Sequence, residues 1–511
     1  MLNANSSWLA HSAQNIGLVF LSLFLLPLDT SLLCLTYCLR LFFTSQATAH
    51  RRNVRGTHTP YFAPKTVLVT GVGMTKGLAL ARLFYAAGHN VIGADFEPVF
   101  APTACGHVSK SLKRFHKLAK PVGGREGTAR YMQSLLHIIR QEKVDMWVSC
   151  SGVASAVEDG EAKEMIELVT PCKAVQFNVA DTKRLHEKHS FIEYTDSLGL
   201  TIPKTHTITS HESALRILES VQGGKEKYIM KYIGTDDAVR GDMTMLPRPT
   251  ALETSQHISR LSISEERPWI LQQYIKGPEY CTHALIIRGE VKAFVACPSA
   301  ELLMHYEALP SDSALSRAML EFTQTHAAAS GDDFTGHLSF DFLVDENEIV
   351  NAEKNRITLY PIECNPRAHT AVALFSNTPE MAAAYMSLLE PLNQGLNGRE
   401  HGANGVPAVP PVYPRKPSKY YWIGHDLVTC AILPLLAVFS ASGPRIEEVL
   451  ESFLKFLEHV VFWKDGTYEF WDPLPWWWLY HVYWPSQFLL ALLTGRRWSR
   501  INVSTTKMFE C

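Results

Sequence analysis

Three side chains of complementary chemistry alternate along residues 361–367, which read PIECNPR. Glu363, Asn365 and Arg367 occupy every second position, and Asp341 lies upstream in an apolar run. Successive side chains of a β-strand point to opposite faces, so the three residues share a face, and Asp341 joins them from a neighbouring strand. Carboxylate and amide oxygens are ligands of Mg²⁺, which commonly also binds phosphates. The pattern predicts a magnesium site for a phosphorylated substrate.

Two lysines extend this prediction. Lys188 belongs to a predicted helix and Lys231 ends a predicted strand, KYIMKY. Each ammonium group can meet a phosphate oxygen as a point charge. Taken singly, an acid on a strand more often lies on a solvated face, and a lone lysine is nearly always on the surface. Together with the oxygen ligands, the two lysines indicate a nucleotide site that lacks a Walker loop.

The chain before this region alternates strand and helix patterns. TVLVTGV reads as a buried strand, TKGLALARLFYAAG as a helix and NVIGADF as the next strand, which is typical of an α/β domain. Gly71, Gly73 and Gly77 form GxGxxxG, and Asp95 ends the second strand. A dinucleotide site is disfavoured because the spacing is not GxGxxG. The turn is equally suited to offering backbone N–H groups to another anion, and Met74, Thr75 and Lys76 after it are candidates for holding an acceptor substrate.

Length, net charge and cysteine content limit the number of domains, the class of partner and the cellular compartment. The 511 residues suffice for two to four domains. The formal net charge is -2, so nothing in the charge balance favours nucleic acid, and small molecules are the expected partners. Ten cysteines without a CxxC pair or zinc-ligand spacing fit reduced thiols facing the cytosol. We predict an apolar anchor at 1–55, an α/β domain at 60–178, a second domain at 179–395, a linker at 396–418 and an aromatic, helical region at 419–511.

Apolar segments near both ends indicate a membrane. Residues 16–43 are long enough to cross a bilayer, although Pro27 and Asp29 interrupt them. The segment either spans, lies in the interface or is a signal peptide cleaved near ATA at 47–49. Basic residues follow it, which places the remaining chain in the cytosol. The Trp-rich stretch 471–498 suits either a membrane interface or a packed helical cap.

The order of these motifs resembles the ATP-grasp superfamily over about residues 180–390. The matching elements are Lys188…Gly199…Pro203, Lys231…Gly241, Gln272-Gln273-Tyr274-Ile275…Glu279, Asp341 and Glu363-x-Asn365-x-Arg367. The resemblance implies an α/β (α+β ATP-grasp) fold, in which a pre-ATP-grasp domain precedes a core of two subdomains. The resemblance also implies ATP and Mg²⁺ as cofactors, with Mn²⁺ able to replace Mg²⁺.

The resemblance also implies residue roles. Lys188 and Lys231 bind phosphates, Arg240 belongs to a lid at 239–242, Gln273, Tyr274 and Ile275 form the adenine hinge, and Glu279 accepts from ribose. Asp341, Glu363 and Asn365 are the metal ligands. Arg367 steadies the transferred phosphoryl group, and His369 follows it toward the reacting centre. His283 shares a strand face with Glu279. Two departures are a long hairpin between Asp341 and Glu363, and Gln272 where several members carry Glu.

Longer phrases resemble the ligase family that joins glycine to 4-deoxygadusol in mycosporine biosynthesis. They include GVGMTKGLALARLFYAAGHNVIGAD, CSGVASAVED, RPWILQQYIKGPEYCTH and IECNPRAHTAVALF. The resemblance implies phosphorylation of a cyclohexenone enol oxygen by ATP, followed by displacement of phosphate by an amino acid amine. Two alternatives remain: a carboxylate–amine ligase acting through an acyl phosphate, and a non-catalytic nucleotide-binding membrane protein.

Overall fold

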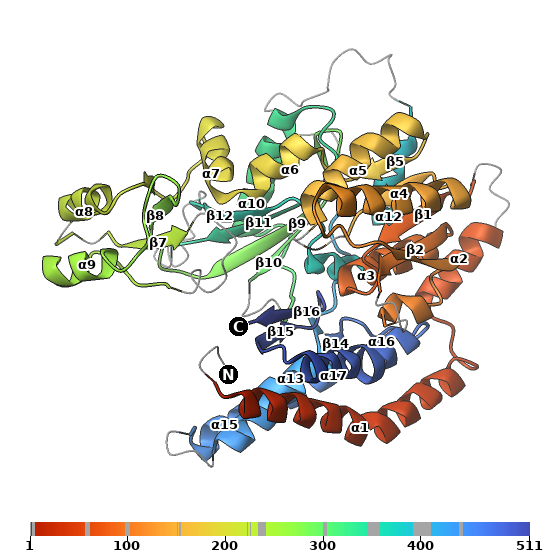
Figure 1. The fold of residues 1–511 in the computed structure, drawn as a ribbon. Helices are drawn as coiled ribbons and strands as arrows, with labels where there is room; N and C mark the ends of the chain where they lie inside the picture. Colours follow the sequence, from red (N-terminus) through yellow and green to blue (C-terminus); the bar gives the residue numbers. More distant parts are fainter. Residues whose placement is uncertain are drawn as a thin grey trace.

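Three bodies make up the molecule (Figure 1): a parallel-sheet domain, an elongated antiparallel region beside it and a helical C-terminal region below both. The computed structural model describes residues 2, 6–56, 62–97, 103–150, 152, 155–221, 223–224, 226–232, 242–299, 304–345, 357–391, 410–438 and 443–511. The predicted α/β class is confirmed, and the apolar N-terminal segment forms a helix.

The first body, the parallel-sheet domain, has the strand order β3-β2-β1-β4-β5. Its strands are β1 (Thr66–Thr70), β2 (Asn90–Phe96), β3 (Arg114–Leu118), β4 (Met146–Val148) and β5 (Lys173–Val175), joined through α3 (Thr75–Ala86), η1 (Cys105–Val108), α4 (Arg125–Glu142) and α5 (Ala156–Val169). The central strands β1 and β4 read as apolar runs because helices cover both sheet faces, whereas the edge strand β3 reads RFHKL and is partly exposed. Gly71 after β1 has a φ of +70°, and the Gly73 N–H donates to Asp95 Oδ2 over 2.6 Å. Asp95 of β2 therefore holds the glycine turn that follows β1. This contact further disfavours a role for Asp95 in binding a dinucleotide ribose.

The second body has two sheets. After α6 (Val179–His186) and α7 (Lys188–Ser197), a small sheet has the order β6-β8-β7, with β6 (Thr205–Ile208), β7 (Tyr228–Tyr232), β8 (Trp269–Gln273), α8 (His211–Ser220) and α9 (Ala251–Ile258). A larger antiparallel sheet has the order β10-β9-β11-β12, with β9 (Glu279–Ile287), β10 (Glu290–Pro298), β11 (Gly336–Leu343) and β12 (Tyr360–Asn365). This pair of sheets is the two-subdomain arrangement that the resemblance implies.

Alternation decides which face of the larger sheet is available for chemistry. Phe340, Phe342 and Cys364 pack in one cluster with Met319 and Phe322 of α10 (Ala314–Ser330). Odd-numbered neighbours of β11 and β12 consequently point to the opposite face. That face is covered by η4 (Thr370–Phe375) and by α12 (Glu380–Met386), which is followed by η5 (Ser387–Leu389).

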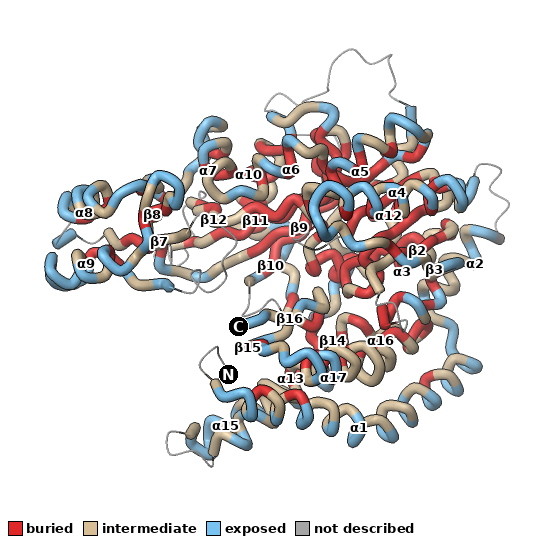
Figure 2. The backbone as a smooth tube through the Cα atoms, in the orientation of Figure 1, coloured by how far each residue is buried: buried red, intermediate tan, exposed pale blue. Residues whose placement is uncertain are grey.

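The C-terminal region shares a core with the first body. It contains β13 (Tyr420–Tyr421), α13 (Ile423–Asp426), the π-helix η6 (Leu427–Ile432), α14 (Leu433–Ala437), α15 (Ile446–Phe462), β14 (Lys464–Asp465), α16 (Leu474–Trp478), the π-helix η7 (Leu479–Tyr483), α17 (Trp484–Thr494), β15 (Trp498–Asn502) and β16 (Lys507–Glu510). Trp422 and Trp484 belong to the same buried cluster as Val67 and Phe84. In Figure 2 buried segments, drawn in red, lie in the parallel sheet and again near β14 and α16. Helix α1 (Trp8–Leu39) runs along this region, and α2 (Gln46–Gly56) returns to the parallel-sheet domain.

A buried ion pair fastens the C-terminal region to α3. Arg82 Nε lies 2.9 Å from Asp472 Oδ2, and its other nitrogens donate to the carbonyls of Thr467 and Asp472 over 2.8 Å each. Asp472, whose side chain is 0% exposed, also accepts from Ser109 Oγ over 2.6 Å and from the Lys110 N–H over 2.8 Å. Each polar atom of this contact is satisfied across a domain boundary.

We expect Asp472→Ala to lower the free energy of unfolding by about 3 to 5 kcal/mol, because it leaves the Arg82 guanidinium buried and unpaired. Glu510→Ala is the control, since Glu510 pairs with Arg496 on the surface and its loss should cost less than about 1 kcal/mol. Urea unfolding followed by tryptophan fluorescence measures both. Equal destabilisation by the two substitutions would contradict the role given to this pair.

Candidate active site

The structure brings the predicted metal ligands together on one face of the larger sheet. Asp341 of β11 and Glu363 of β12 are direct cross-strand partners, and Asn365 pairs with Ser339. Asn365 Nδ2 donates to Asp341 Oδ2 over 3.1 Å, and the Arg367 guanidinium donates to the Asn365 amide oxygen. Three potential oxygen ligands and a guanidinium thus converge, as the alternating sequence predicts.

Several carboxyl groups lie close together on this face. Burial, together with the Glu363 and Glu279 carboxylates, raises the pKa of Asp341 to about 8. Asp341 is only 9% exposed, and within the described part of the chain its Oδ1 has no hydrogen-bond partner. An unpartnered carboxylate oxygen among other oxygen donors fits a hard divalent cation such as Mg²⁺, whose charge would offset the repulsion. The donor set present is therefore suited to that ion.

The two predicted phosphate lysines approach from different elements. Lys188, the first residue of α7, has its Nζ 3.7 Å from Glu363 Oε2. Lys231 of β7 donates to Gln272 Oε1 over 2.6 Å. Burial, with the Lys188 charge as a smaller cause, lowers the pKa of Lys231 to about 8. A glutamate at position 272 would neutralise this ammonium group, whereas the neutral Gln272 amide leaves its charge for a phosphate.

Two of the three backbone N–H groups in the predicted adenine hinge already have hydrogen-bond partners. The Gln273 N–H donates to the Lys204 carbonyl over 2.8 Å and the Tyr274 N–H to the Lys227 carbonyl over 2.7 Å. Both donors are therefore occupied by neighbouring segments. The buried Ile275 is the hinge residue whose N–H has no recorded partner among the described residues. An adenine ring could accept a hydrogen bond there without displacing an existing one.

Of the other residues predicted to bind the nucleotide, the structure describes Glu279 but not Arg240. Glu279 begins β9, and its Oε1 accepts from Ser299 Oγ over 2.6 Å. Its charge acts on both Asp341 and Lys231, which places it beside the metal face. Arg240 and the lid positions 239–241 lie outside the described residues. The hairpin insertion at 346–356 lies outside them too.

His369 has a structural task in addition to its proximity to Arg367. Its Nδ1 accepts from the Ala371 N–H over 3.3 Å and so caps η4, while its own N–H donates to His283 Nδ1 over 3.3 Å. Burial, followed by the charges of Arg367 and Lys76, lowers the pKa of His369 to about 3. The imidazole is therefore neutral at physiological pH and is not a source of protons for general acid catalysis.

Lys76 joins the parallel-sheet domain to the metal strand. It lies in the first turn of α3, is 3% exposed, and donates from Nζ to the Ala368 carbonyl over 3.0 Å. Burial, with Arg367 as the next cause, lowers the pKa of Lys76 to about 7. This side chain is consequently poised to gain a proton when an anionic group binds beside it.

A cavity of about 410 Å³ opens at the carboxyl ends of β1 and β2. This edge is where ligands bind in open parallel sheets. Its lining includes Gly71, Met74, Asp95, Tyr131, Ser155, Tyr483 and Thr506. Sequence reasoning gave Met74 but missed Tyr483 and Thr506, since nothing in the sequence places the C-terminal region over this turn.

Comparisons with known proteins bear on the whole chain. No protein-family model matches it, and no curated protein does. Among solved structures, the L-amino acid ligase from Bacillus licheniformis is 15% identical, with a TM-score of 0.42 over 65% of this chain and 75% of that one. The ADP complex of purK, an N5-carboxyaminoimidazole ribonucleotide synthetase, is 10% identical, with a TM-score of 0.48 over 78% and 98%. Biotin carboxylase from Campylobacter jejuni is 13% identical, with a TM-score of 0.45 over 65% and 72%.

We expect the affinity for ATP to fall as the pH rises above about 8, because Lys231 then loses the proton that attracts a phosphate. The protonated fraction decreases roughly tenfold for each pH unit above the pKa. In Lys231→Arg the loss of affinity above about pH 8 should be smaller, because a guanidinium keeps its charge. Titration calorimetry in two buffers of different ionisation enthalpy would also detect proton uptake on binding. Identical pH profiles for the two proteins would contradict the assignment.

Proposed function

We propose that the protein is an ATP-dependent, ADP-forming ligase that joins an amino acid amine, with glycine as the expected donor, to a cyclohexenone of the 4-deoxygadusol type. The observation that carries the proposal is the face formed by Asp341, Glu363 and Asn365 with two lysines opposite. Oxygen ligands and separate cationic groups are what phosphoryl transfer requires, since its catalysis consists mainly of positioning and charge stabilisation. The mycosporine substrate rests on the family resemblance of the sequence.

The first half-reaction activates the acceptor. The enol oxygen of the cyclohexenone attacks the γ-phosphorus of ATP, and the bond to the β-phosphate oxygen breaks to release ADP. Lys188 and Lys231 would hold phosphate oxygens, and Arg367 would stabilise charge on the group in transfer. A divalent ion held by Asp341, Glu363 and Asn365 would neutralise phosphate charge.

The second half-reaction forms the C–N bond. The neutral amine adds to the ring carbon that bears the phosphate, phosphate leaves with the bonding electrons of the C–O bond, and the nitrogen loses a proton. The departing phosphate can accept that proton, whereas His369 is a weak base because its Nδ1 caps η4 and its pKa is lowered to about 3. Lys76, whose pKa is lowered in part by Arg367, is suited to orient an anionic substrate group. The cavity at Met74 and Asp95 is a candidate place for the acceptor ring.

The decisive experiment incubates the full-length protein with ATP, Mg²⁺, 4-deoxygadusol and a mixture of amino acids, and detects products by mass spectrometry. We expect ADP release only when both acceptor and amine are present. Asp341→Asn should lower kcat by about 100-fold or more. Glu290→Gln, an exposed acid on the same sheet, is the control and should leave kcat unchanged.

Other outcomes select the alternatives. An amide product from a carboxylic acid and an amine, without reaction of the cyclohexenone, would replace this substrate by that of a carboxylate–amine ligase. ATP binding without ADP release across both substrate panels would favour the non-catalytic nucleotide-binding protein.

We further propose that the protein attaches to a membrane through α1 lying flat on the bilayer. Among the described residues, α1 is the one helix long and apolar enough to span, and its most apolar window has no buried share. Every seventh residue of α1 is nevertheless polar: Asn15, Ser22, Asp29 and Thr36. In a helix, residues seven apart share a face, so these side chains form one stripe.

The stripe is hydrogen-bonded to the C-terminal region. Trp498 Nε1 donates to Asn15 Oδ1 over 2.9 Å, Ser22 Oγ donates to the Tyr480 carbonyl over 2.9 Å, and Thr36 Oγ1 lies 3.0 Å from the Tyr468 hydroxyl. Asp29 Oδ2 lies 2.8 Å from His481 Nε2. A spanning helix would lose these contacts, at about 1 kcal/mol each. A cleaved signal peptide would leave their partners unsatisfied.

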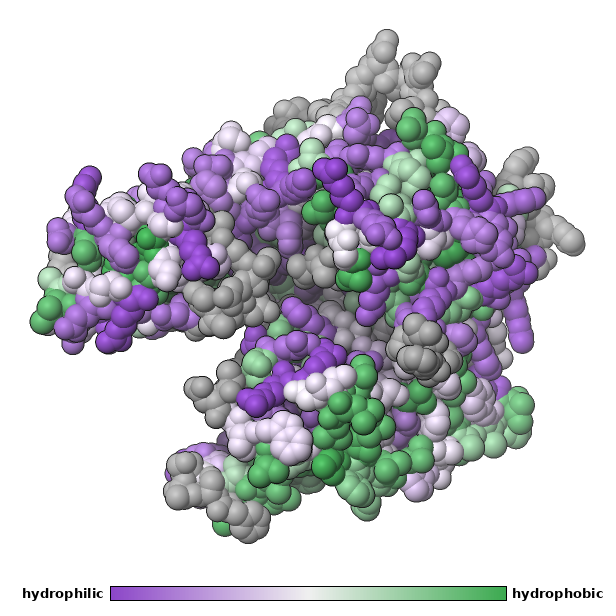
Figure 3. Space-filling view, in the orientation of Figure 1, coloured by the Kyte–Doolittle hydropathy of each residue, from purple (hydrophilic) through white to green (hydrophobic). Residues whose placement is uncertain are grey.

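The outer face of this helix is apolar and continues onto its neighbours. Figure 3 shows apolar surface gathered over the lower part of the molecule, where α1 and the C-terminal helices lie. Exposed side chains include Phe20, Leu23, Phe24 and Leu28 of α1, Leu450, Leu454 and Val461 of α15, and Leu489 and Leu493 of α17. An apolar face on a helix whose polar face is anchored suits the interface plane of a bilayer.

We expect Phe20→Glu with Phe24→Glu to release the protein from liposomes in a flotation assay, because two charges would enter the apolar face. Leu168→Glu on α5 is the control, since Leu168 is equally exposed but lies in the parallel-sheet domain. In sealed microsomes, tags at both ends should be digested by protease from the same side. A protected N-terminal tag would show that α1 spans.

A further inference from the structure

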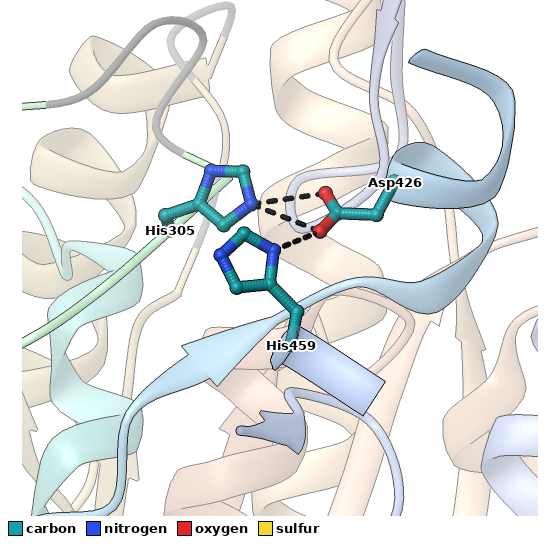
Figure 4. A group of neighbouring side chains, drawn as sticks. All are labelled: His305, Asp426 and His459. Atoms are coloured by element: carbon teal, nitrogen blue, oxygen red, sulfur yellow. Dashed lines mark hydrogen bonds and ion pairs between the residues drawn. The ribbon is translucent and has the colours of Figure 1, made fainter. Parts of the chain in front are cut away.

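A second group of potential metal ligands lies outside the proposed active site. His305, Asp426 and His459 point toward one another (Figure 4). His305 Nε2 is 2.9 Å from Asp426 Oδ1 and 3.1 Å from Oδ2, and His459 Nδ1 contacts Oδ2. The three residues come from the segment after β10, the end of α13 and the last turns of α15. Their ligand atoms all lie within 4.8 Å of one another, which is the compactness of a coordination sphere.

The charge at this group needs a cation. The Asp426 side chain is 0% exposed and that of His459 is 4% exposed. Within the described part of the chain, the recorded ion pairs of Asp426 are with these two histidines, and none is with lysine or arginine. A buried carboxylate without a permanent positive partner is costly. Here it is hydrogen-bonded to two imidazoles, and a bound metal ion would supply the positive charge that neutral imidazoles lack.

The local backbone is also unusual. Asp426 ends α13 and is followed at once by the π-helical turn of η6, before α14 resumes an α-helix. Insertions of this kind are rare and occur frequently at functional sites, because the widened turn re-aims the side chains beside it. Here the turn begins directly after the carboxylate that both histidines approach.

We propose that His305 Nε2, His459 Nδ1 and an Asp426 carboxylate oxygen bind a divalent first-row metal ion, with zinc as the expected ion. Two imidazole nitrogens and one carboxylate are the ligands that zinc accepts, whereas Mg²⁺ and Ca²⁺ prefer oxygen alone. The His305 side chain is 23% exposed, so a water molecule can take the fourth position. The site is separate from the proposed magnesium face and does not depend on the ligase reaction.

The ion would fasten the C-terminal region to the active-site wall. Tyr306, next to His305, exchanges two backbone hydrogen bonds of 2.9 Å with Tyr420. Its ring centroid lies 5.8 Å from that of His369 and 5.8 Å from that of Trp422. A metal that holds His305 against α13 and α15 therefore also fixes the position of Tyr306 beside His369. We assign the ion a positioning role, because its three ligands come from three separate segments of the chain.

The test measures metal in the full-length protein purified without chelator. We expect about one zinc per chain by inductively coupled plasma mass spectrometry in the wild type and in His425→Gln. His425 precedes the ligand Asp426 but is not one of the three, so it is a matched control. Asp426→Asn and His459→Gln should bind zinc at least about 10-fold to 100-fold more weakly. Equal zinc content in His459→Gln and His425→Gln, or none in the wild type, would overturn the proposal.

A second measurement covers a variant that fails to fold. His305→Ala removes the ligand that is partly exposed and leaves the buried Asp426 and His459 in place. Adding Zn²⁺ to chelator-treated wild type should raise Tm, while His305→Ala with an unchanged circular dichroism spectrum should not respond. Co²⁺ should give visible absorption bands in the wild type that are absent from His305→Ala. Equal responses of the two proteins to both ions would show that the three residues form an ion-pair network without a metal.

Discussion

The structure depends on the concentration of carboxylates at one face of the larger sheet. Burial, and after it the nearby Glu363 and Glu279 carboxylates, raises the pKa of Asp341 to about 8. Asp341 can keep its proton here at neutral pH, and nearby positive charge favours its ionised form. The chain supplies positive charge through Arg367 at the strand end and Lys188 at a helix terminus. A metal ion bound with nucleotide would add further positive charge. Much of the surrounding fold can be understood as the means of holding these charges apart from water.

The segment that follows the metal strand is where the three bodies meet. Ala368 accepts from Lys76 of the parallel-sheet domain, and Thr370 Oγ1 lies 3.2 Å from Ser504 Oγ near the C-terminus. The buried pair of Arg82 and Asp472 joins the same two bodies elsewhere. The C-terminal region is therefore part of the site as well as the support of α1. The proposed membrane surface and the proposed nucleotide face would thus be held in one fixed relation.

How far the site could be predicted differs from residue to residue. The alternation of Glu363, Asn365 and Arg367 sufficed, because strand geometry fixes which side chains share a face. The pairing of Asp341 with Glu363 followed from two adjacent strands in one hairpin. The hinge remains a prediction, and the structure adds that the N–H groups of Gln273 and Tyr274 donate to the Lys204 and Lys227 carbonyls on other segments. His369 was assigned from its position next to Arg367, without its role as a helix cap.

By itself the sequence determined the α/β class, the parallel sheet at its start, the order of the charged residues and the polar stripe at every seventh residue of α1. These features follow from backbone periods of two or 3.6 residues, which act within one element. Tertiary structure alone decided the partners of that stripe, the cover of Tyr483 and Thr506 over the cavity, and the meeting of His305 with Asp426 and His459. Those ligands are 121 and 33 residues apart from the carboxylate. No local period relates positions so distant, because packing of the whole chain sets their contact.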